Sequence, residues 1–326
     1  MIETEAKTMV VGIDISIEDT TCAIVDIRGN IIAMSKFNTC DYLDVNKYAT
    51  TLCGEIMKLI ESSCGIENIR SVGISAPSGN LKTGCIENSP NLPWKGSIPL
   101  AAMLRDRLGL AVALGNDTHA VIFGEYTFGC GHGMKNFGII TLGNGIGNAF
   151  FTRGKLHQGN NGFAGELGHM CMVDNGRQCN CGRKGCLERY VSGSGIVITA
   201  REMMEKSDAP SLMREIEHLT AKNIGDCCDK GDEMAIEVYR RTGYMLGIAL
   251  ANYAAIIDPE AIVLTGGVSR AGKWLLEPTV KSFDEHVFPN IKGRVKLLIS
   301  SMNHRERDIL GASVMAWGVK EYSLFK

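Results

Sequence analysis

Four residues have the types and spacing of a metal site. Three cysteines, Cys179, Cys181 and Cys186, fall within eight residues, and His169 lies ten residues before the first of them. Three thiolates and one imidazole give Zn²⁺ four ligands in a tetrahedron, which makes a closed structural site. Glycines between the cysteines let the backbone turn tightly enough for the sulfurs to meet at one ion. A different metal, or a disulfide within the cluster, is the alternative, and the residue types favour zinc.

Two carboxylates flank this cluster. Glu166 lies three residues before His169, and Glu188 lies two residues after Cys186. A lone glutamate is usually a solvated surface residue. Because both of these lie within the span of the predicted metal loop, we interpret them as polar groups held at a pocket.

The composition is that of an ordinary globular chain. Its 326 residues are 45% hydrophobic and 21% charged, with a net charge of −2. This length suits two domains, and no basic excess indicates a nucleic-acid partner. The N-terminus lacks the apolar core of a signal peptide, and the longest apolar run, 244–257, is too short to span a bilayer, so a buried helix is expected. We expect a cytoplasmic protein with no membrane partner, whose scattered cysteines are reduced, buried thiols: Cys22, Cys53, Cys64 and Cys85.

A supersecondary unit occurs twice in the chain. Short apolar runs joined by turns predict one β-meander over 9–34 and a second over 137–156. Such a repeat, about a domain apart, indicates a duplicated α/β architecture, two domains around a central cleft. The predicted smaller domain covers 8–117 together with 308–326, including a closing helix over 309–322. The predicted larger domain, 118–307, carries the zinc motif.

Five motifs follow one another along the chain: Gly-Ile-Asp at 12–14, Asn-Asp at 116–117, Thr-Leu-Gly-Asn-Gly-Ile-Gly at 141–147, Gly-Glu-Leu-Gly-His at 165–169 and Cys-Asn-Cys-Gly-Arg-Lys-Gly-Cys-Leu-Glu at 179–188. These motifs and their order resemble the ROK family of sugar kinases, repressors and open-reading-frame proteins, within the actin-like, hexokinase-type ATPase fold. The resemblance runs from about Met9 to about Trp317, and no DNA-binding helix-turn-helix precedes Met9. The chain is therefore similar to the kinase branch, which includes glucokinases and N-acetylmannosamine kinases.

The resemblance implies a sugar site. Asp117 matches the family's catalytic base, which takes a proton from the attacking sugar hydroxyl. The alternative is a helix cap, because Asn-Asp-Thr before a helix caps it well. Glu166, His169 and Glu188 match sugar ligands, and a histidine with one nitrogen on zinc offers its other nitrogen to a hydroxyl; a satisfied core histidine is the alternative. The remaining candidates, for which plain turns compete, are Gly79, Asn80, Asn91 and Asn116.

The resemblance also implies a nucleotide site. Gly143, Asn144 and Gly145 match the family's second phosphate loop, where successive backbone N–H groups bind an anion; a hairpin turn is the alternative. Gly266 and Gly267 match an adenosine contact. Asp14 is expected to hold a Mg²⁺-bound water.

One loop departs from the family pattern. The family's Asp is followed by a Gly-Gly-Thr run, whereas Ser16, Ile17 and Glu18 stand at the equivalent positions here. A β-branched residue hinders close approach of the backbone, and the acids Glu18 and Asp19 repel the γ-phosphate unless Mg²⁺ or a lysine compensates. A shifted hairpin would let Ser16 or Thr20 supply the missing hydroxyl.

Two function classes follow. The first is a kinase that uses ATP and Mg²⁺ to phosphorylate the 6-hydroxyl of a hexose or N-acylhexosamine, with a structural Zn²⁺. The second is a sugar-binding sensor or regulator that has lost phosphoryl transfer. Family habit implies a homodimer or homotetramer.

Overall fold

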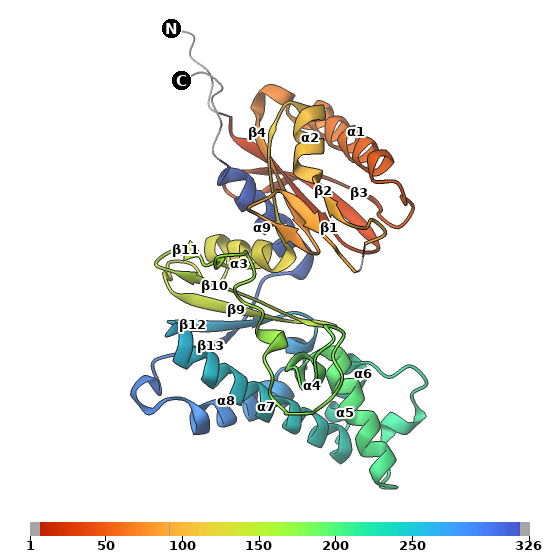
Figure 1. The fold of residues 1–326 in the computed structure, drawn as a ribbon, viewed down its shortest axis with the longest axis vertical. Coiled ribbons are helices and arrows are strands. Elements are labelled where there is room, and N and C mark those ends of the chain that lie inside the picture. The colour runs from red at the N-terminus through yellow and green to blue at the C-terminus, as the bar shows by residue number, and fades with distance from the viewer. Residues whose placement is uncertain (1–6, 91, 320–326) are drawn as a thin grey trace. The chain divides into compact units, whose positions relative to one another are not determined.

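The computed structural model describes residues 7–90 and 92–319. The candidate residue Asn91 and the last part of the predicted closing helix, 320–322, lie outside the described residues. The chain forms two compact units: unit 1 is residues 1–132 with 301–326, and unit 2 is Gly133–Ser300. Each unit is built on one five-stranded sheet (Figure 1).

Unit 1 contains a mixed sheet whose strand order is β3-β2-β1-β4-β8. The first three strands form an antiparallel meander, and β4 and β8 run parallel to β1. The carboxyl ends of three parallel strands therefore meet at one edge, where open α/β sheets bind ligands. The strands are β1 (Met9–Ile15), β2 (Asp19–Asp26), β3 (Ile31–Asn38), β4 (Ile69–Ala76) and β8 (Ala111–Asn116).

Alternation along β1 determines which helices cover the sheet of unit 1. Val11 and Ile13 belong to the apolar cluster that includes α1 and α2, whereas Val10 packs with α9. Successive side chains of a strand point to opposite faces, so helices lie on both sides of the sheet (Figure 1). The helices are α1 (Val45–Ser63), α2 (Leu100–Leu108), α3 (Asp117–Phe128) and α9 (His304–Trp317), and the small second sheet is β5 (Gly79–Asn80), β6 (Cys85–Glu87) and β7 (Ser97–Ile98).

Unit 2 repeats this topology. Its strand order is β11-β10-β9-β12-β13, again an antiparallel meander followed by two strands parallel to the first. The duplicated α/β fold predicted from the two meanders is therefore confirmed. The strands are β9 (Phe137–Leu142), β10 (Ile146–Thr152), β11 (Lys155–Leu156), β12 (Ala261–Thr265) and β13 (Lys296–Ile299).

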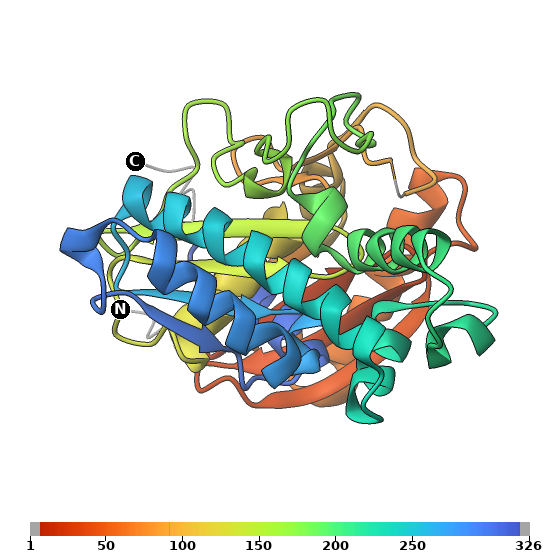
Figure 2. The ribbon, with the colours of Figure 1, turned by 90° about the horizontal axis from the view of Figure 1, so that it is seen from below.

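The apolar run at 244–257 belongs to α7, which is buried on one face only, because Tyr244 and Ile256 are 46% and 78% exposed. Figure 2 shows α7 and α8 side by side over the sheet of unit 2. They pack closely because Gly243 and Gly247 face α8, where a Cβ would lie 2.6 Å from Pro278 Cγ and 2.5 Å from Ser282 Cβ, respectively. No helix in the described ranges is long and apolar enough to cross a membrane. The helices are α4 (Glu188–Val191), α5 (Gly193–Lys206), α6 (Ala221–Asp229), α7 (Glu233–Ile257) and α8 (Lys273–His286).

Short 3₁₀ helices complete the described secondary structure. They are η1 (Ile66–Asn68), η2 (Leu167–His169), η3 (Leu212–Glu215), η4 (Val268–Ala271) and η5 (Pro289–Ile291).

The units divide at other positions than the sequence predicts. The predicted boundaries follow residues 117 and 307, whereas the observed ones follow His132 and Ser300. The reason is the contact between α3 and α9, which places both helices in unit 1. A Cβ at Gly311 would lie 1.8 Å from the carbonyl oxygen of Ala120, so the two helix backbones approach closely. The closing helix also begins earlier than predicted, at His304, and ends at Trp317.

This contact predicts that Gly311→Ala destabilises unit 1. The added methyl group has no room, and overpacking typically costs roughly 1–3 kcal/mol. The matched control is Gly54→Ala in α1, where a Cβ meets no atom within 4 Å and where alanine should stabilise the helix by up to about 1 kcal/mol. Calorimetry of both variants measures the difference. Equal melting temperatures for the two variants would contradict this account of the α3–α9 contact.

Candidate functional site

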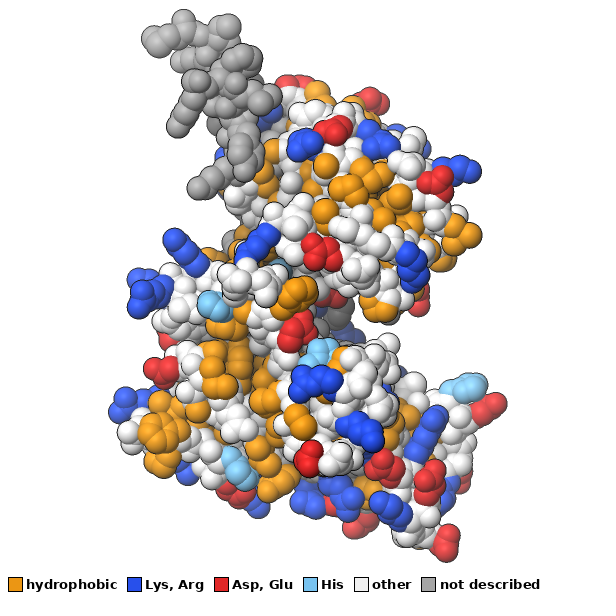
Figure 3. Space-filling view, in the orientation of Figure 1, with side chains coloured by type: hydrophobic (Ala, Val, Ile, Leu, Met, Phe, Trp, Pro, Cys, Tyr) orange, Lys and Arg blue, Asp and Glu red, His pale blue; other side chains and the backbone are white. Residues whose placement is uncertain are grey.

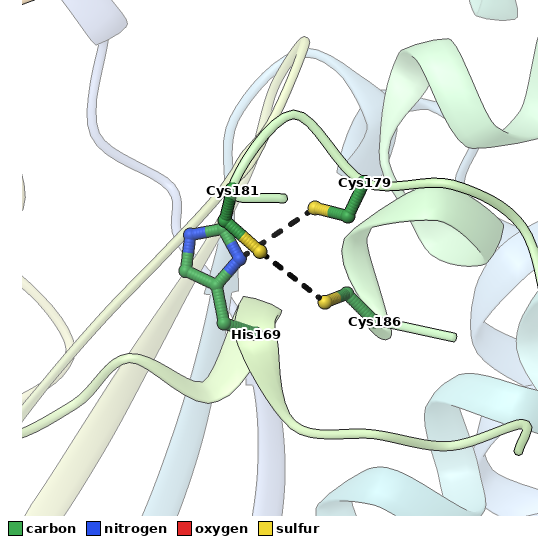
Figure 4. Close-up of side chains that lie close together, drawn as sticks. All are labelled: His169, Cys179, Cys181 and Cys186. Atoms are coloured by element: carbon green, nitrogen blue, oxygen red, sulfur yellow. Dashed lines mark hydrogen bonds between the residues drawn. The ribbon is translucent and has the colours of Figure 1, made fainter. Parts of the chain in front are cut away.

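The predicted metal ligands lie together in unit 2 (Figure 4). The donor atoms of His169, Cys179, Cys181 and Cys186 all lie within 4.8 Å of one another. The sulfurs of Cys181 and Cys186 are 3.7 Å apart, and the sulfur of Cys179 is 3.8 Å from His169 Nδ1. Tetrahedral zinc would hold such S–S and S–N pairs about 3.8 and 3.5 Å apart, given bonds of about 2.3 and 2.0 Å. The cluster therefore has the dimensions of a zinc site.

A tight backbone hairpin brings these sulfurs together. Gly182 and Gly185 both have positive φ, and a Cβ at Gly185 would lie 1.8 Å from Val173 O. The backbone N–H of Cys179 donates to Arg183 O at 2.8 Å and closes the turn. A backbone N–H at Arg183 also lowers the pKa of the Cys181 thiol, which favours the thiolate that a metal requires.

The other cysteines show where the sequence interpretation holds. None of the twelve cysteines, all of which the structure describes, forms a disulfide, so the disulfide alternative is not seen. Cys22 and Cys53 are buried as predicted, whereas Cys64 and Cys85 are only half-buried. Cys171, which lies two residues after His169, is exposed.

His169 faces two ways from the short helix η2. Its Nδ1 points toward Cys179, and its Nε2 lies 3.9 Å from Glu166 Oε2. The side chains of His169 and Glu166 are 35% and 60% exposed, so a ligand can reach both. His169 is therefore not a core histidine, and its second nitrogen is available to a hydroxyl.

Glu188 begins α4 and contacts the glycine turn after β9. Its Oε2 accepts a hydrogen bond from the backbone N–H of Ile146 at 3.0 Å. A Cβ at Gly145 would lie 2.6 Å from the same oxygen, so a side chain there would displace the carboxylate. Sequence spacing did not reveal this link, because the two segments are far apart along the chain.

The glycine turn, Gly143–Gly145, is held by the start of α5. The backbone N–H of Gly193 donates to Gly143 O at 2.7 Å, and the Ser194 hydroxyl donates to Asn144 O at 3.0 Å. Ser192 caps this helix by accepting from Gly195 N–H. The turn is therefore braced by a helix as well as by its own hairpin.

A cavity of about 980 Å³ opens beside this turn, entirely within unit 2. That volume suits a nucleotide-sized ligand. Gly143, Asn144 and Gly267 line it, whereas Gly145 and Gly266 are not among its lining residues. Gly266 has φ +93°, and a Cβ there would lie 2.4 Å from Leu142 O, so its role is close packing.

The cavity is locally basic. Side chains of both signs are mixed where α5 and α6 face the viewer in Figure 3, so this basicity is not part of a wider basic surface on that face. Trp274 is fixed at the wall by a 2.8 Å hydrogen bond from Nε1 to Asp229 Oδ1. We did not single out this tryptophan, because one aromatic residue in a helix carries no signal without topology. The charged lining residues are Arg189, Arg201, Lys222, Asp226, Asp229, Arg270 and Lys273.

In unit 1, the strand register brings the acidic candidates to one edge of the sheet. Asp14 pairs with Ser75, and Ser75 pairs with Gly115. Neighbouring strands are spaced by about 4.8 Å, so Asp14 and Gly115 lie about 10 Å apart. The Ser75 hydroxyl donates to Asp14 Oδ1 at 2.9 Å. Asn116 and Asp117 follow directly after Gly115.

Asn116 and Asp117 have different roles at the start of α3. Asn116 is the N-cap, and its Oδ1 accepts from Thr118 N–H at 2.8 Å. Asp117 is the first helical residue and is exposed to solvent, although one of its oxygens also accepts from Thr118. The cap alternative therefore applies to Asn116 and leaves Asp117 available.

Desolvation by the surrounding protein raises the pKa of Asp117, and Asp308 adds to the rise while Thr118 and Arg307 oppose it. His119, two residues later, is buried, and this lowers its pKa to about 4. It is therefore neutral at neutral pH and does not offset the charge of Asp117.

Gly79 and Asn80 form the short strand β5. Gly79 packs on β8, where a Cβ would lie 2.3 Å from Gly115 O. Asn80 accepts from Lys82 N–H and donates to Glu87 Oε1, so its side chain stabilises the local hairpin. The turn interpretation accounts for both residues.

The loop after Asp14, which differs from the family pattern, is a short turn stabilised by Ser16. The Ser16 hydroxyl donates to Asp19 O at 2.9 Å and accepts from Asp19 N–H at 3.0 Å. Thr20 is fully buried, and its hydroxyl bonds to Thr39 and Tyr48. Neither residue therefore supplies the missing hydroxyl. Lys36 pairs with Asp19 at 2.6 Å and compensates one of the two acids.

Comparison with known proteins decides the family. A model of the ROK family matches residues 10–318. The chain belongs to the ROK family. The family and the fold that the motifs predicted are confirmed.

The proteins to which the chain is similar include glucokinases and xylose repressors. The chain is 33% identical to a glucokinase of Thermotoga maritima over 312 residues, which cover 94% of this chain and 96% of that protein. It is 26% identical to a xylose repressor of Bacillus subtilis over 305 residues, covering 90% and 73%. A ROK family glucokinase structure from Streptomyces griseus, in complex with glucose and AMPPNP, has a TM-score of 0.77 and 28% identity, covering 95% of this chain and 100% of that one.

The cluster geometry predicts that the reduced protein, purified without chelator, contains about one zinc per chain. Cys181→Ser should lose most of this zinc and lower the melting temperature, because metal-binding energy is part of folding energy. Cys171→Ser is the matched control, since both thiols are exposed but only Cys181 belongs to the cluster. Elemental analysis by mass spectrometry decides. Sub-stoichiometric zinc in the unmodified protein, or equal zinc loss in both variants, would rule the site out.

Proposed function

We propose that this ROK-family protein transfers the γ-phosphoryl group of ATP to the 6-hydroxyl of a hexose or N-acylhexosamine. The observation that carries the proposal is the placement of Asp117: an accessible carboxylate at the ligand-binding edge of a parallel sheet, with a raised pKa and with Asp14 on the same edge. The glucokinase relatives support sugar phosphorylation as the reaction class.

The sugar-binding role falls to polar groups around the metal cluster. Glu166 and Glu188 offer carboxylate oxygens to pairs of sugar hydroxyls, and His169 offers Nε2. Zinc held by His169 and the three cysteines would fix the loop and the orientation of that imidazole. Asn116, whose Oδ1 caps α3, still has amide N–H groups to donate to a sugar hydroxyl.

Asp117 is proposed to act as the general base. Phosphoryl transfer depends mainly on positioning and charge stabilisation, and the base accepts the hydroxyl proton as the oxygen attacks. Because Asp117 must be ionised, activity should fall as the pH drops through its pKa. That acidic limb should lie above 3.8, the ordinary aspartate value, because the pKa is raised.

ATP is proposed to occupy the cavity of unit 2. The lining of this cavity contains five basic and two acidic side chains, and the glycine turn at the edge of the cavity brings backbone groups close to the proposed ligand. Mg²⁺ would neutralise charge on the phosphates, with Asp14 holding a water of its shell. Trp274 offers an aromatic face, and Lys273 lies over its ring with Nζ 4.5 Å from the centroid.

A regulator is the second candidate, and the turn after Asp14 favours it. Ser16 and Thr20 have their hydroxyls engaged elsewhere, so the turn lacks the threonine hydroxyl of the family pattern. The similarity to a xylose repressor supports this second candidate. Such a protein would bind sugar without turnover.

A coupled assay of ADP release against a panel of hexoses and hexosamines separates the two candidates. We expect turnover with at least one sugar, and Asp117→Asn should lower kcat by roughly 10²–10⁴-fold while sugar still raises the melting temperature. Asp106→Asn, an exposed aspartate of unit 1 paired with Arg105, is the control and should keep full activity. A sugar that stabilises the protein without any ADP release would favour the regulator.

The turn after Asp14 yields a separate prediction. Glu18→Thr removes an uncompensated acid from the proposed phosphate loop and should raise kcat/KM for ATP by roughly three- to tenfold, as expected for one charge at intermediate dielectric. Glu61→Thr, an exposed acid in α1, is the control. Steady-state kinetics with varied ATP measures the effect. An unchanged kcat/KM would show that this turn does not meet the phosphates.

A further inference from the structure

The guanidinium of Arg177 has a hydrogen-bond acceptor for every one of its five N–H groups. Nε and one N–H of Nη2 bond Glu202 at 2.9 and 2.6 Å, and the other N–H of Nη2 donates to Thr199 Oγ1 at 3.0 Å. Nη1 donates to Arg189 O at 2.7 Å and to Gly195 O at 3.2 Å. An arginine has five donors in a fixed fork, so this set saturates it.

The backbone and the ring contacts of Arg177 belong to the metal loop. Arg177 lies two residues before Cys179, and its carbonyl accepts from the N–H of Gly185, which precedes Cys186. Its own N–H donates to Tyr190 Oη at 2.8 Å, and the guanidinium stacks over the Tyr190 ring at 4.6 Å. One residue therefore joins both ends of the metal loop to α4.

The side-chain contacts of Arg177 belong to α5, the helix that braces the glycine turn. Gly195, Thr199 and Glu202 all lie on α5. The first residues of that helix hold Gly143 and Asn144 by hydrogen bonds. The contacts of Arg177 thus connect the metal loop, through α5, to the proposed phosphate turn.

Glu188 lies between these two ends. Its backbone carbonyl accepts from the Ser192 hydroxyl at 2.6 Å, just before α5, and its side chain accepts from Ile146 N–H beyond the turn. A shift of the metal loop relative to α5 would therefore move Glu188 away from the turn.

We propose that Arg177 is a positioning residue for the phosphoryl transfer proposed above, and the inference rests on that function. By tying the metal loop to α5, it holds the sugar-side carboxylate of Glu188 and the phosphate turn Gly143–Asn144 in one arrangement. It touches neither the sugar nor the phosphate group in this scheme.

Arg177 differs from the surface ion pairs of the chain. Its side chain is 15% exposed, whereas the side chains of Arg105 and Arg240, which pair with Asp106 and Glu237, are each 60% exposed. Exposed ion pairs contribute little to folding stability. A lysine at 177 would keep the charge but lose the planar fork, and therefore most of the contacts to α4 and α5.

The test compares Arg177→Lys with Arg214→Lys. Arg214 also donates to backbone carbonyls around α5, but at its far end, through Met204 O and Ala209 O. We expect Arg177→Lys to lower kcat/KM for the sugar by roughly tenfold or more and to raise KM for ATP, because both sides of the arrangement loosen. Arg214→Lys should leave both parameters within about twofold.

Two further readouts do not depend on turnover. Zinc release to a colorimetric chelator should be faster in Arg177→Lys than in Arg214→Lys, and calorimetric affinity for AMPPNP should be lower. If Arg177→Lys lowers the melting temperature but leaves kinetics, zinc release and AMPPNP affinity equal to those of Arg214→Lys, Arg177 has only a stabilising role and the proposal is overturned.

The design keeps the two failures apart. If the unmodified protein turns over no sugar, the proposed kinase function fails, and zinc release with AMPPNP affinity still decides whether Arg177 links the two regions. If Arg177→Lys does not fold, Glu202→Gln replaces it, because glutamine keeps one hydrogen-bond acceptor for the Arg177 guanidinium. Intermediate losses in kinetics, zinc retention and AMPPNP affinity would then support the proposal. No loss in any of these readouts would refute it.

Discussion

The hydrogen bond between Glu188 and the backbone of Ile146 is the constraint on which the chemistry proposed for unit 2 depends. It joins a carboxylate placed by the metal loop to a turn placed by the sheet, although the two segments are separated by a long stretch of chain. Glycine at 145 is required for this approach, since a Cβ would lie 2.6 Å from the carboxylate oxygen. The metal loop therefore has more than a local effect on stability, because its position determines where Glu188 contacts the turn.

The duplicated sheet explains why the candidate site residues occur where they do. In unit 1, β1 ends one residue after Asp14 and β8 ends at Asn116, and in unit 2, β9 and β12 end before Gly143 and Gly266. Parallel strands bring their carboxyl ends to one edge, so each copy of the fold presents its own row of strand ends. The two copies differ in what they carry: acidic side chains in unit 1, and close-approaching glycine backbone in unit 2.

Motif residues and strand periodicity were enough to predict the family, the duplicated topology and the metal cluster. Sequence could not place the unit boundaries, because these depend on the close α3–α9 packing through Gly124 and Gly311, which leaves no periodic signal. The sequence also contained no sign of the Arg177 contacts or of Trp274 at the cavity wall. Their roles arise from contacts between segments that are not adjacent in the chain, and such contacts exist only once topology is known.

Asn80 shows the opposite case, in which a residue chosen for function has a local structural role. Its amide and carbonyl both bond within the β5–β6 hairpin, so the turn chemistry of asparagine accounts for it. A short polar residue in a loop carries the same sequence signal whether it binds a ligand or closes a turn. Hydrogen-bond partners, rather than residue type, separate the two.

The turn after Asp14 is where this chain differs most from the family pattern, and its hydrogen bonds suggest what has changed. Ser16 fastens the turn through its backbone N–H and its hydroxyl, both of which bond to Asp19. Lys36 neutralises Asp19, whereas Glu18 forms no ion pair within the part of the chain that the structure describes. None of these changes displaces Asp14 or Asp117 from the sheet edge. The departure therefore affects the side proposed to meet the phosphate donor, while Asp117, the proposed base, keeps its place after the end of β8.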